Sequence, residues 1–149
     1  MKHKRSGIFS LALFLFLFFS AFQSVSGQDY NMFTLDFFKR SIECLINGDY
    51  DNAIINSNNV IRRDPNSAVA HTIRARAYYE KGDMANAITD CTQAIRLDRN
   101  NISAYSIRAS AYARAGNRDR AVSDWQAILR INPENNEAKK NIDLINRNE

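Results

Sequence analysis

The chain has 149 residues, enough for one domain with or without a targeting segment, and 45% of them are hydrophobic, as in an ordinary globular protein. Three of the 20 Lys and Arg residues lie in the first five positions, and the other 17 are matched by 16 Asp and Glu residues, all after residue 27. The body of the chain is therefore nearly neutral, which excludes the extended basic surface that nucleic acid requires.

The first 27 residues have the organisation of an export signal. Residues 1–5 are basic, residues 8–22 form an apolar run rich in Leu and Phe, and residues 23–27 are mostly small or polar. Val25 and Gly27 fit the small-residue rule for signal cleavage, so we expect a cut after Gly27. The alternative is an uncleaved membrane anchor formed by residues 8–22, although this run is short for a bilayer core of about 30 Å. Both interpretations place the rest of the chain outside the cytoplasm, either periplasmic or secreted.

After a short segment at residues 28–33, the sequence repeats with a period of 34 residues. The repeats run over residues 34–67, 68–101 and 102–135, and a remnant covers residues 136–149. The positions that carry the period are the glycines Gly48, Gly82 and Gly116, the polar residues Asp49, Asp83 and Asn117 that follow them, and the alanines Ala53, Ala87 and Ala121. A fixed period of this length indicates one unit copied in tandem, whose copies stack to bury a common core.

Each repeat predicts a helix of about fourteen residues, a tight turn and a second helix. The Gly of the turn can adopt the left-handed conformation that ends a helix, and the Asp or Asn after it can cap the next helix. Pro65 and Pro133 then break the second helix of their repeats. Small residues at positions eight and twenty let the two helices approach closely: Ser41, Ala75 and Ala109 at the first, and Ala53, Ala87 and Ala121 at the second.

The pattern is clearest in residues 77–88 (AYYEKGDMANAI) and 111–117 (AYARAGN). On these segments and the 34-residue period, the chain resembles the tetratricopeptide repeat family. The resemblance covers residues 34–135 and implies an all-α fold, an α-solenoid in which three helix-turn-helix repeats form a right-handed superhelix. The tail at residues 136–149 looks like that family's C-terminal capping helix, because Ala138, Ile142 and Ile145 share one helical face.

Two Arg and Asp pairs recur at the same register. Arg74 and Asp90 are 16 residues apart, and so are Arg108 and Asp124. We expect each pair to form a structural ion pair between the first and the second helix of its repeat. Repeat one has Asn56 where the Asp would stand, which weakens the corresponding pair.

No arrangement in the sequence predicts a catalytic, cofactor or metal site. His71 occupies a position where the other repeats have aromatic residues, so we expect it to be packed rather than to act as a ligand or base. Cys44 and Cys91 fall on helices that are not neighbours in a stacked array, so we expect two buried free thiols rather than a disulfide. The chain is therefore not expected to be an enzyme.

The resemblance implies where a partner would bind, because the first helices of successive repeats line a concave groove in this family. The predicted partner-binding residues are Leu35, Phe38, Ile42 and Leu45 in repeat one, Thr72, Arg76 and Tyr79 in repeat two, and Ser106, Ser110 and Arg114 in repeat three. Such a groove changes from apolar to polar along its length. Family members that bind chaperone tails clamp a terminal carboxylate with Lys and Asn, but here Phe38 and Ile42 stand at the first two of these positions. That specificity is not expected.

The first helix of repeat one is apolar on two faces, so both should be covered. The cover is either residues 28–33, folded back, or a partner, and both options remain open. We predict a non-enzymatic adaptor or scaffold that binds a protein or peptide outside the cytoplasm, with membrane attachment only if residues 8–22 remain uncleaved. The alternatives are a homo-oligomeric structural component that associates through repeat one, and an accessory ligand-binding protein of an envelope pathway.

Overall fold

The computed structural model describes residues 32–147, and every regular element in that range is a helix. The chain divides into two compact units, Met1–Asp36 and Phe37–Glu149, and the second contains most of the repeat region. Among the helices that the structure describes, none is long and apolar enough to cross a membrane. The predicted export signal at residues 1–27 and the alternative anchor at residues 8–22 lie outside the described residues.

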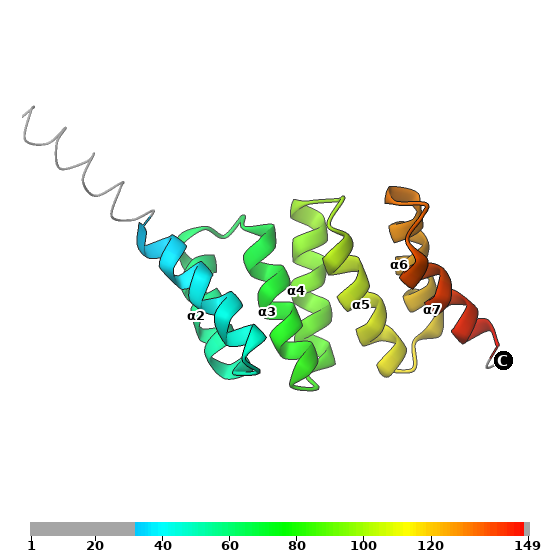
Figure 1. The fold of residues 1–149 in the computed structure, drawn as a ribbon, viewed down its shortest axis with the longest axis horizontal. Helices are drawn as coiled ribbons and strands as arrows, with labels where there is room; N and C mark the ends of the chain where they lie inside the picture. Colours follow the sequence, from blue (N-terminus) through cyan, green and yellow to red (C-terminus); the bar gives the residue numbers. More distant parts are fainter. Residues whose placement is uncertain (1–31, 148–149) are drawn as a thin grey trace, which may run out of the picture. The chain divides into compact units, whose positions relative to one another are not determined.

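The helices stack in chain order, and this confirms the predicted all-α solenoid. A helix over residues 32–46 precedes α2 (Tyr50–Arg63), α3 (Ala68–Glu80), α4 (Met84–Leu97), α5 (Ile102–Arg114), α6 (Arg118–Ile131) and α7 (Asn136–Asn146). Each helix from α2 to α7 packs against its neighbours in sequence, and α3 also packs against α5 (Figure 1). The first helices of repeats two and three therefore share one face of the stack.

The turn inside each repeat depends on a left-handed glycine. The backbone φ angles of Gly48, Gly82 and Gly116 are 76°, 85° and 76°. In repeat two, the Asp83 amide donates to the Tyr78 carbonyl at 2.9 Å and the Gly82 amide donates to the Tyr79 carbonyl at 3.0 Å. These two bonds satisfy carbonyl groups at the end of α3, and the same pair recurs in the other two repeats.

The predicted helix caps form at two of the three turns. The Asp49 side chain accepts a hydrogen bond from the Asn52 amide, and the Asp83 side chain accepts one from the Asn86 amide. The cap predicted for Asn117 is wrong, because its side chain makes no capping hydrogen bond to α6. The residue type does not explain the missing bond, because the side chains of Asn101 and Asn135 cap α5 and α7.

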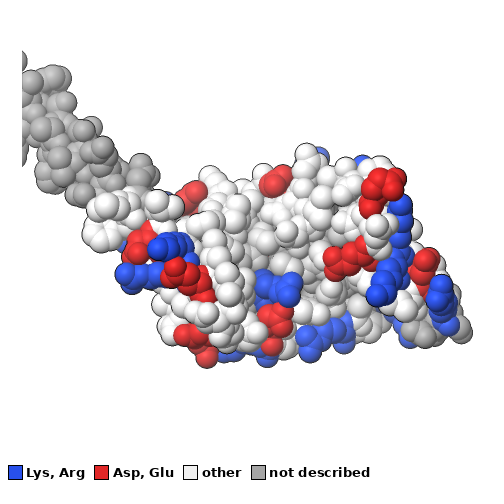
Figure 2. All heavy atoms as spheres, in the orientation of Figure 1, with Lys and Arg blue, Asp and Glu red and all other residues white. Residues whose placement is uncertain are grey.

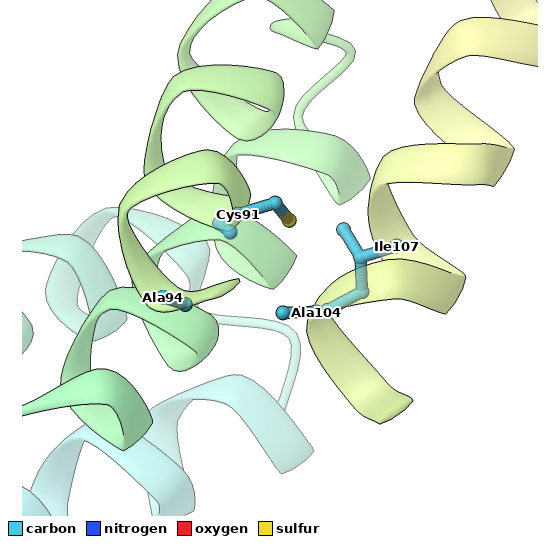
Figure 3. Packing of buried hydrophobic residues seen from close by; sticks show 5 residues of the cluster. Cys91, Ala94, Ala104 and Ile107 are labelled. Carbon is cyan, nitrogen blue, oxygen red and sulfur yellow. The ribbon is translucent and has the colours of Figure 1, made fainter. Parts of the chain in front are cut away.

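The core is built from the small residues of the repeat and extends across repeat boundaries. Ala75, Ala87 and Ala121 are fully buried. The Cys91 side chain of α4 packs with Ala104 and Ile107 of α5, as Figure 3 shows. A second cluster joins Ala109, Ala121, Trp125, Ile128 and Ala138, so that α7 covers the end of repeat three. Neither cluster is complete within one repeat, which is why the repeats must stack.

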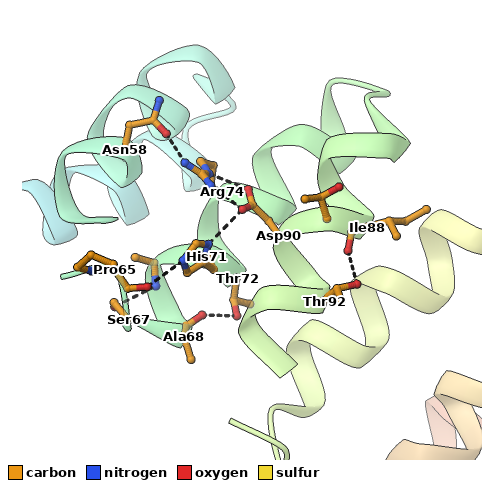
Figure 4. A network of polar contacts seen from close by, with 12 residues as sticks. Asn58, Pro65, Ser67, Ala68, His71, Thr72, Arg74, Ile88, Asp90 and Thr92 are labelled. Carbon is orange, nitrogen blue, oxygen red and sulfur yellow. Dashed lines mark hydrogen bonds and ion pairs between the residues drawn. The ribbon is translucent and has the colours of Figure 1, made fainter. Parts of the chain in front are cut away.

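Both predicted ion pairs are confirmed. The Nη2 of Arg74 lies 2.6 Å from Oδ1 of Asp90, and the Nη2 of Arg108 lies 2.7 Å from Oδ1 of Asp124. His71 is packed, as expected, and joins the first pair: its Nδ1 lies 3.1 Å from Asp90 Oδ1 and its Nε2 lies 3.3 Å from the Pro65 carbonyl (Figure 4). In repeat one, Asn56 donates instead to the Asn52 carbonyl at 2.8 Å and to Cys44 Sγ at 3.9 Å.

Candidate peptide-binding groove

A hollow of about 330 Å³ lies on the face that the first helices share. Its lining residues are Leu45 from the helix over residues 32–46, Thr72, Ile73 and Arg76 from α3, Ser103, Ser106 and Ile107 from α5, and Glu137 from α7. In Figure 1 these first helices and α7 lie in front of the second helices. Figure 2 has the same orientation, and shows charged side chains of both signs at the N-terminal end of the described residues, along the lower edge and at the C-terminal end.

Four of the predicted partner-binding residues line the hollow: Leu45, Thr72, Arg76 and Ser106. Phe38 and Ile42 lie on the same helix as Leu45, are partly buried and do not line it. Tyr79, Ser110 and Arg114 lie farther along α3 and α5, beyond the hollow. Leu35 belongs to the first compact unit and has an exposed side chain. The hollow is thus one part of the face that the resemblance implies.

Four lining residues are not among the predicted partner-binding residues given above: Ile73, Ser103, Ile107 and Glu137. Ile73 and Ile107 occupy the same repeat position, and this periodicity marks them as core residues. Their side chains are 8% and 6% exposed, and the exposed edges form the floor of the hollow. Glu137 lies in the first turn of α7, which was interpreted only as a cap for repeat three. Its place on the hollow depends on how α7 packs against α6, and no pattern in the sequence reports that packing.

A cluster of cations and one aromatic ring borders the hollow on α3 and α5. The Nε of Arg76 donates to Glu80 Oε1 at 2.7 Å, and the Arg76 guanidinium carbon lies 5.9 Å from the centre of the Tyr79 ring. From α5, the Arg114 guanidinium carbon lies 5.0 Å from the same ring centre. Two guanidinium groups therefore meet one ring within cation–π distance, which orients both of them on the groove face.

The Thr72 hydroxyl is already engaged in the structure. It donates to the Ala68 carbonyl at 2.8 Å and accepts from Asn101 Nδ2 at 3.0 Å. Since the Asn101 side chain also caps α5 at Ala104, Thr72 helps to join repeat two to repeat three. A hydroxyl has one proton and two lone pairs, so Thr72 keeps only acceptor capacity for a partner.

The Cys and His side chains of the described residues do not line the hollow. The described residues contain no group of three His, Cys, Asp or Glu side chains placed to hold a metal ion. Burial raises the pKa of the Cys91 thiol to about 12, so the nucleophilic thiolate is scarce at neutral pH. The other thiol, Cys44, is also free but is partly exposed, so the prediction that both thiols are buried is wrong for Cys44. His71 is held by Asp90 and the Pro65 carbonyl and does not line the hollow.

Comparison with known proteins agrees with this geometry. A family model for the TPR repeat matches residues 75–116, and no curated protein gives a significant match. The first TPR of Spaghetti (RPAP3), solved with the HSP90 peptide SRMEEVD, is 30% identical with a TM-score of 0.74, over 76% of this chain and 90% of that chain. The second TPR domain of the human RPAP3 protein was solved with the HSP70 peptide SGPTIEEVD. It is 28% identical with a TM-score of 0.74, and the match covers 78% of this chain and 98% of that chain.

The Arabidopsis OM64 TPR domain is 22% identical, with a TM-score of 0.75 over 78% of this chain and 96% of that chain, and shows likeness of fold alone. The stacked helical hairpins are thus shared with solved TPR domains that this chain covers over 90% to 98% of their length. This chain belongs to the tetratricopeptide repeat family.

Proposed function

We propose that the chain is a non-enzymatic adaptor that binds a segment of another protein along the face formed by its first helices. The observation that carries the proposal is the hollow lined jointly by α3, α5 and α7, because one extended or helical segment can contact all of them at once. The two RPAP3 domains named above were solved with chaperone peptides, and the TPR2B domain of yeast Sti1, which is 26% identical, was solved in a complex with pHsp70. Peptide binding in these relatives supports the same mode of action here.

The groove residues divide into an apolar part and a polar part. Phe38, Ile42 and Leu45 would anchor apolar side chains of the partner, while Arg76, Tyr79 and Arg114 would select its polar groups. With Phe38 and Ile42 in place of the Lys and Asn that hold a terminal carboxylate, the partner is not a chaperone tail. The partner segment therefore carries apolar side chains toward repeat one.

The proposed place of action is outside the cytoplasm. The basic start and the apolar run at residues 8–22 support export, with cleavage after Gly27. The intact mass of the exported protein tests this: a chain that begins at Gln28 supports cleavage, and a full-length chain in the membrane fraction supports the anchor. Recovery of the protein in the cytoplasm would contradict both.

Site-specific crosslinking tests the groove itself. A photoreactive residue at Ser106, which lines the hollow, should capture a partner, whereas the same residue at exposed Thr89 on α4 should not. The captured protein is then purified and titrated against the wild type and the R114E variant, whose charge reversal lies outside the hollow. Loss of affinity in this variant is expected, and unchanged affinity would remove the polar part of the proposal.

Self-association through repeat one is the second candidate. Ile46 is 77% exposed at the end of the helix over residues 32–46, and Ile55 on α2 is 55% exposed. Exposed aliphatic side chains of this size favour an interface. Light scattering on the wild type and on the I46S variant distinguishes the candidates: a dimer that dissociates in the variant favours self-association, and a monomer in both favours the adaptor.

A further inference from the structure

We infer that the hollow receives the side chain of a Lys or Arg from the partner segment, with the aliphatic stem over Ile73 and Ile107 and the cationic group beside Glu137. The inference rests on the proposed function of the groove and names the chemistry of its partner. The observations that carry it are the charges, the floor and the hydroxyl groups of the hollow.

The charges of the hollow leave one carboxylate uncompensated. Its two charged residues are Arg76 and Glu137. Arg76 is neutralised by Glu80 at 2.7 Å, on the side of the Tyr79 ring. Within residues 32–147, Glu137 has no ion pair or side-chain hydrogen bond, and the nearby Lys139 is 3.5 Å from Glu134 instead. A cation is therefore the group that this hollow attracts.

Glu137 lies in the first turn of α7 but does not cap this helix. The Asn135 side chain caps the same helix end by accepting from the Ala138 amide at 2.8 Å, so the carboxylate of Glu137 is not needed as the cap. Its charge remains available to a ligand in the hollow.

The floor and the volume suit a long side chain with an apolar stem. Ile73 and Ile107 are almost fully buried and expose one edge to the hollow, and Leu45 adds an apolar wall. A volume of 330 Å³ is roughly that of ten water molecules in the liquid, so a full Lys or Arg side chain fits. Lys and Arg bury their methylene groups on apolar surface and keep the charge at a polar rim.

Two hydroxyl groups complete the polar rim. Ser103 and Ser106 line the hollow and make no side-chain hydrogen bond with any residue that the structure describes. Lys and Arg bring only hydrogen-bond donors, which a carboxylate and two serine oxygens can accept. An acidic side chain would place a second negative charge beside Glu137, and a purely aliphatic one would desolvate that carboxylate without a partner.

Selection of binders from a phage library of random dodecapeptides, with the full-length protein as the target, tests this chemistry. We expect the selected peptides to share a Lys or Arg at a fixed place next to apolar residues. In fluorescence polarisation with the best synthetic peptide, replacing this residue by the uncharged norleucine should weaken binding about three- to ten-fold to the wild type. The same replacement should have little effect on binding to the E137Q variant.

The matched control is the E134Q variant, which removes an exposed carboxylate that does not line the hollow. It should keep the full preference for the cationic peptide, and the melting temperatures of both variants should match that of the wild type. Selected peptides without a shared basic residue, or a preference that persists in E137Q, would overturn the inference while leaving peptide binding intact.

Different results would contradict the proposed peptide-binding function of the groove. If no peptide binds, or if peptides bind equally well to an S106W variant with a blocked hollow, the proposed function fails together with the inference. If the hollow is instead filled by a second copy of this chain, sedimentation will show a dimer that is lost in E137Q, and that result also overturns the inference. A T89W variant on the opposite helix layer controls for the added indole ring.

Discussion

Arg74 and Asp90 form a two-point ion pair between α3 and α4: Nε of Arg74 donates to Oδ2 at 2.7 Å and Nη2 donates to Oδ1 at 2.6 Å. The remaining Nη1 donates to Asn58 Oδ1 on α2 at 2.6 Å. One guanidinium group therefore holds three successive helices together across a repeat boundary (Figure 4). Arg108 repeats the arrangement 34 residues later, with Asp124 on α6 and Thr92 on α4.

Replacing Asp90 by Ala should lower stability without removing partner binding. Asp90 is 4% exposed, so its loss leaves the Arg74 guanidinium and His71 without their shared acceptor. We expect a loss of about 2 to 3 kcal/mol, near the lower end for a buried pair because Arg74 keeps some contact with water. For a chain of this size the melting temperature should fall by about 5 to 10 °C, measured by circular dichroism. Asp143→Ala, at an exposed position of α7, is the control, and equal melting of both variants would dismiss the pair as a stabiliser.

The same pair should make the fold sensitive to acid. Burial alone would raise the pKa of Asp90, but hydrogen bonds and charges from Arg74 and His71 outweigh it, and the pKa lies below its ordinary value of 3.8. A lowered pKa in the folded state gives stability that is present above pH 3.8 and is lost as the pH falls through the lower folded value. The D90N variant cannot lose this contribution, so its melting temperature should fall less than that of the wild type between pH 5 and pH 3. Parallel curves would contradict the assignment.

The two cysteines should differ in reactivity. Cys91 is fully buried and its pKa is raised to about 12, whereas Cys44 is partly exposed. In the native protein, a thiol reagent at pH 8 should modify Cys44 quickly and Cys91 only as fast as the fold opens. Mass spectrometry of the labelled peptides gives the two rates, and the C44S variant isolates the slow one. Equal rates, or an intramolecular disulfide on a non-reducing gel, would contradict the stacking of these helices.

The turn glycine of repeat two should be sensitive to any side chain with a Cβ. Gly82 has φ 85° and no heavy atom within 4 Å of the place that a Cβ would occupy, so only the backbone conformation is at stake. Gly82→Ala should cost about 1 to 2 kcal/mol, and Gly82→Asn should cost less, because Asn tolerates the left-handed region. Urea unfolding of both variants measures the difference. An Ala variant as stable as the wild type would mean that the turn changes conformation.

The sequence alone determined the repeat unit. Gly, Asp and Ala at fixed offsets specify where a helix must end, where the next begins and where two helices touch, and these are local requirements of backbone conformation and side-chain volume. The Arg74 and Asp90 pair was predictable for the same reason, since both residues recur at one register. The failed cap at Asn117 marks the limit of such rules, because a residue type that can cap a helix, as Asn101 does on α5, does not form the bond at every such position.

Tertiary structure alone decided what the groove contains. The periodicity of Ile73 and Ile107 predicts that both side chains are buried. That one edge of each side chain lines the hollow depends on how far apart α3 and α5 lie. Likewise, Glu137 comes from the terminal helix, outside the repeats, and reaches the hollow through the packing of α7 on α6. A period in sequence fixes contacts between copies of one unit, whereas the floor and charge of a shared surface depend on distances and angles between whole helices, which no single repeat encodes.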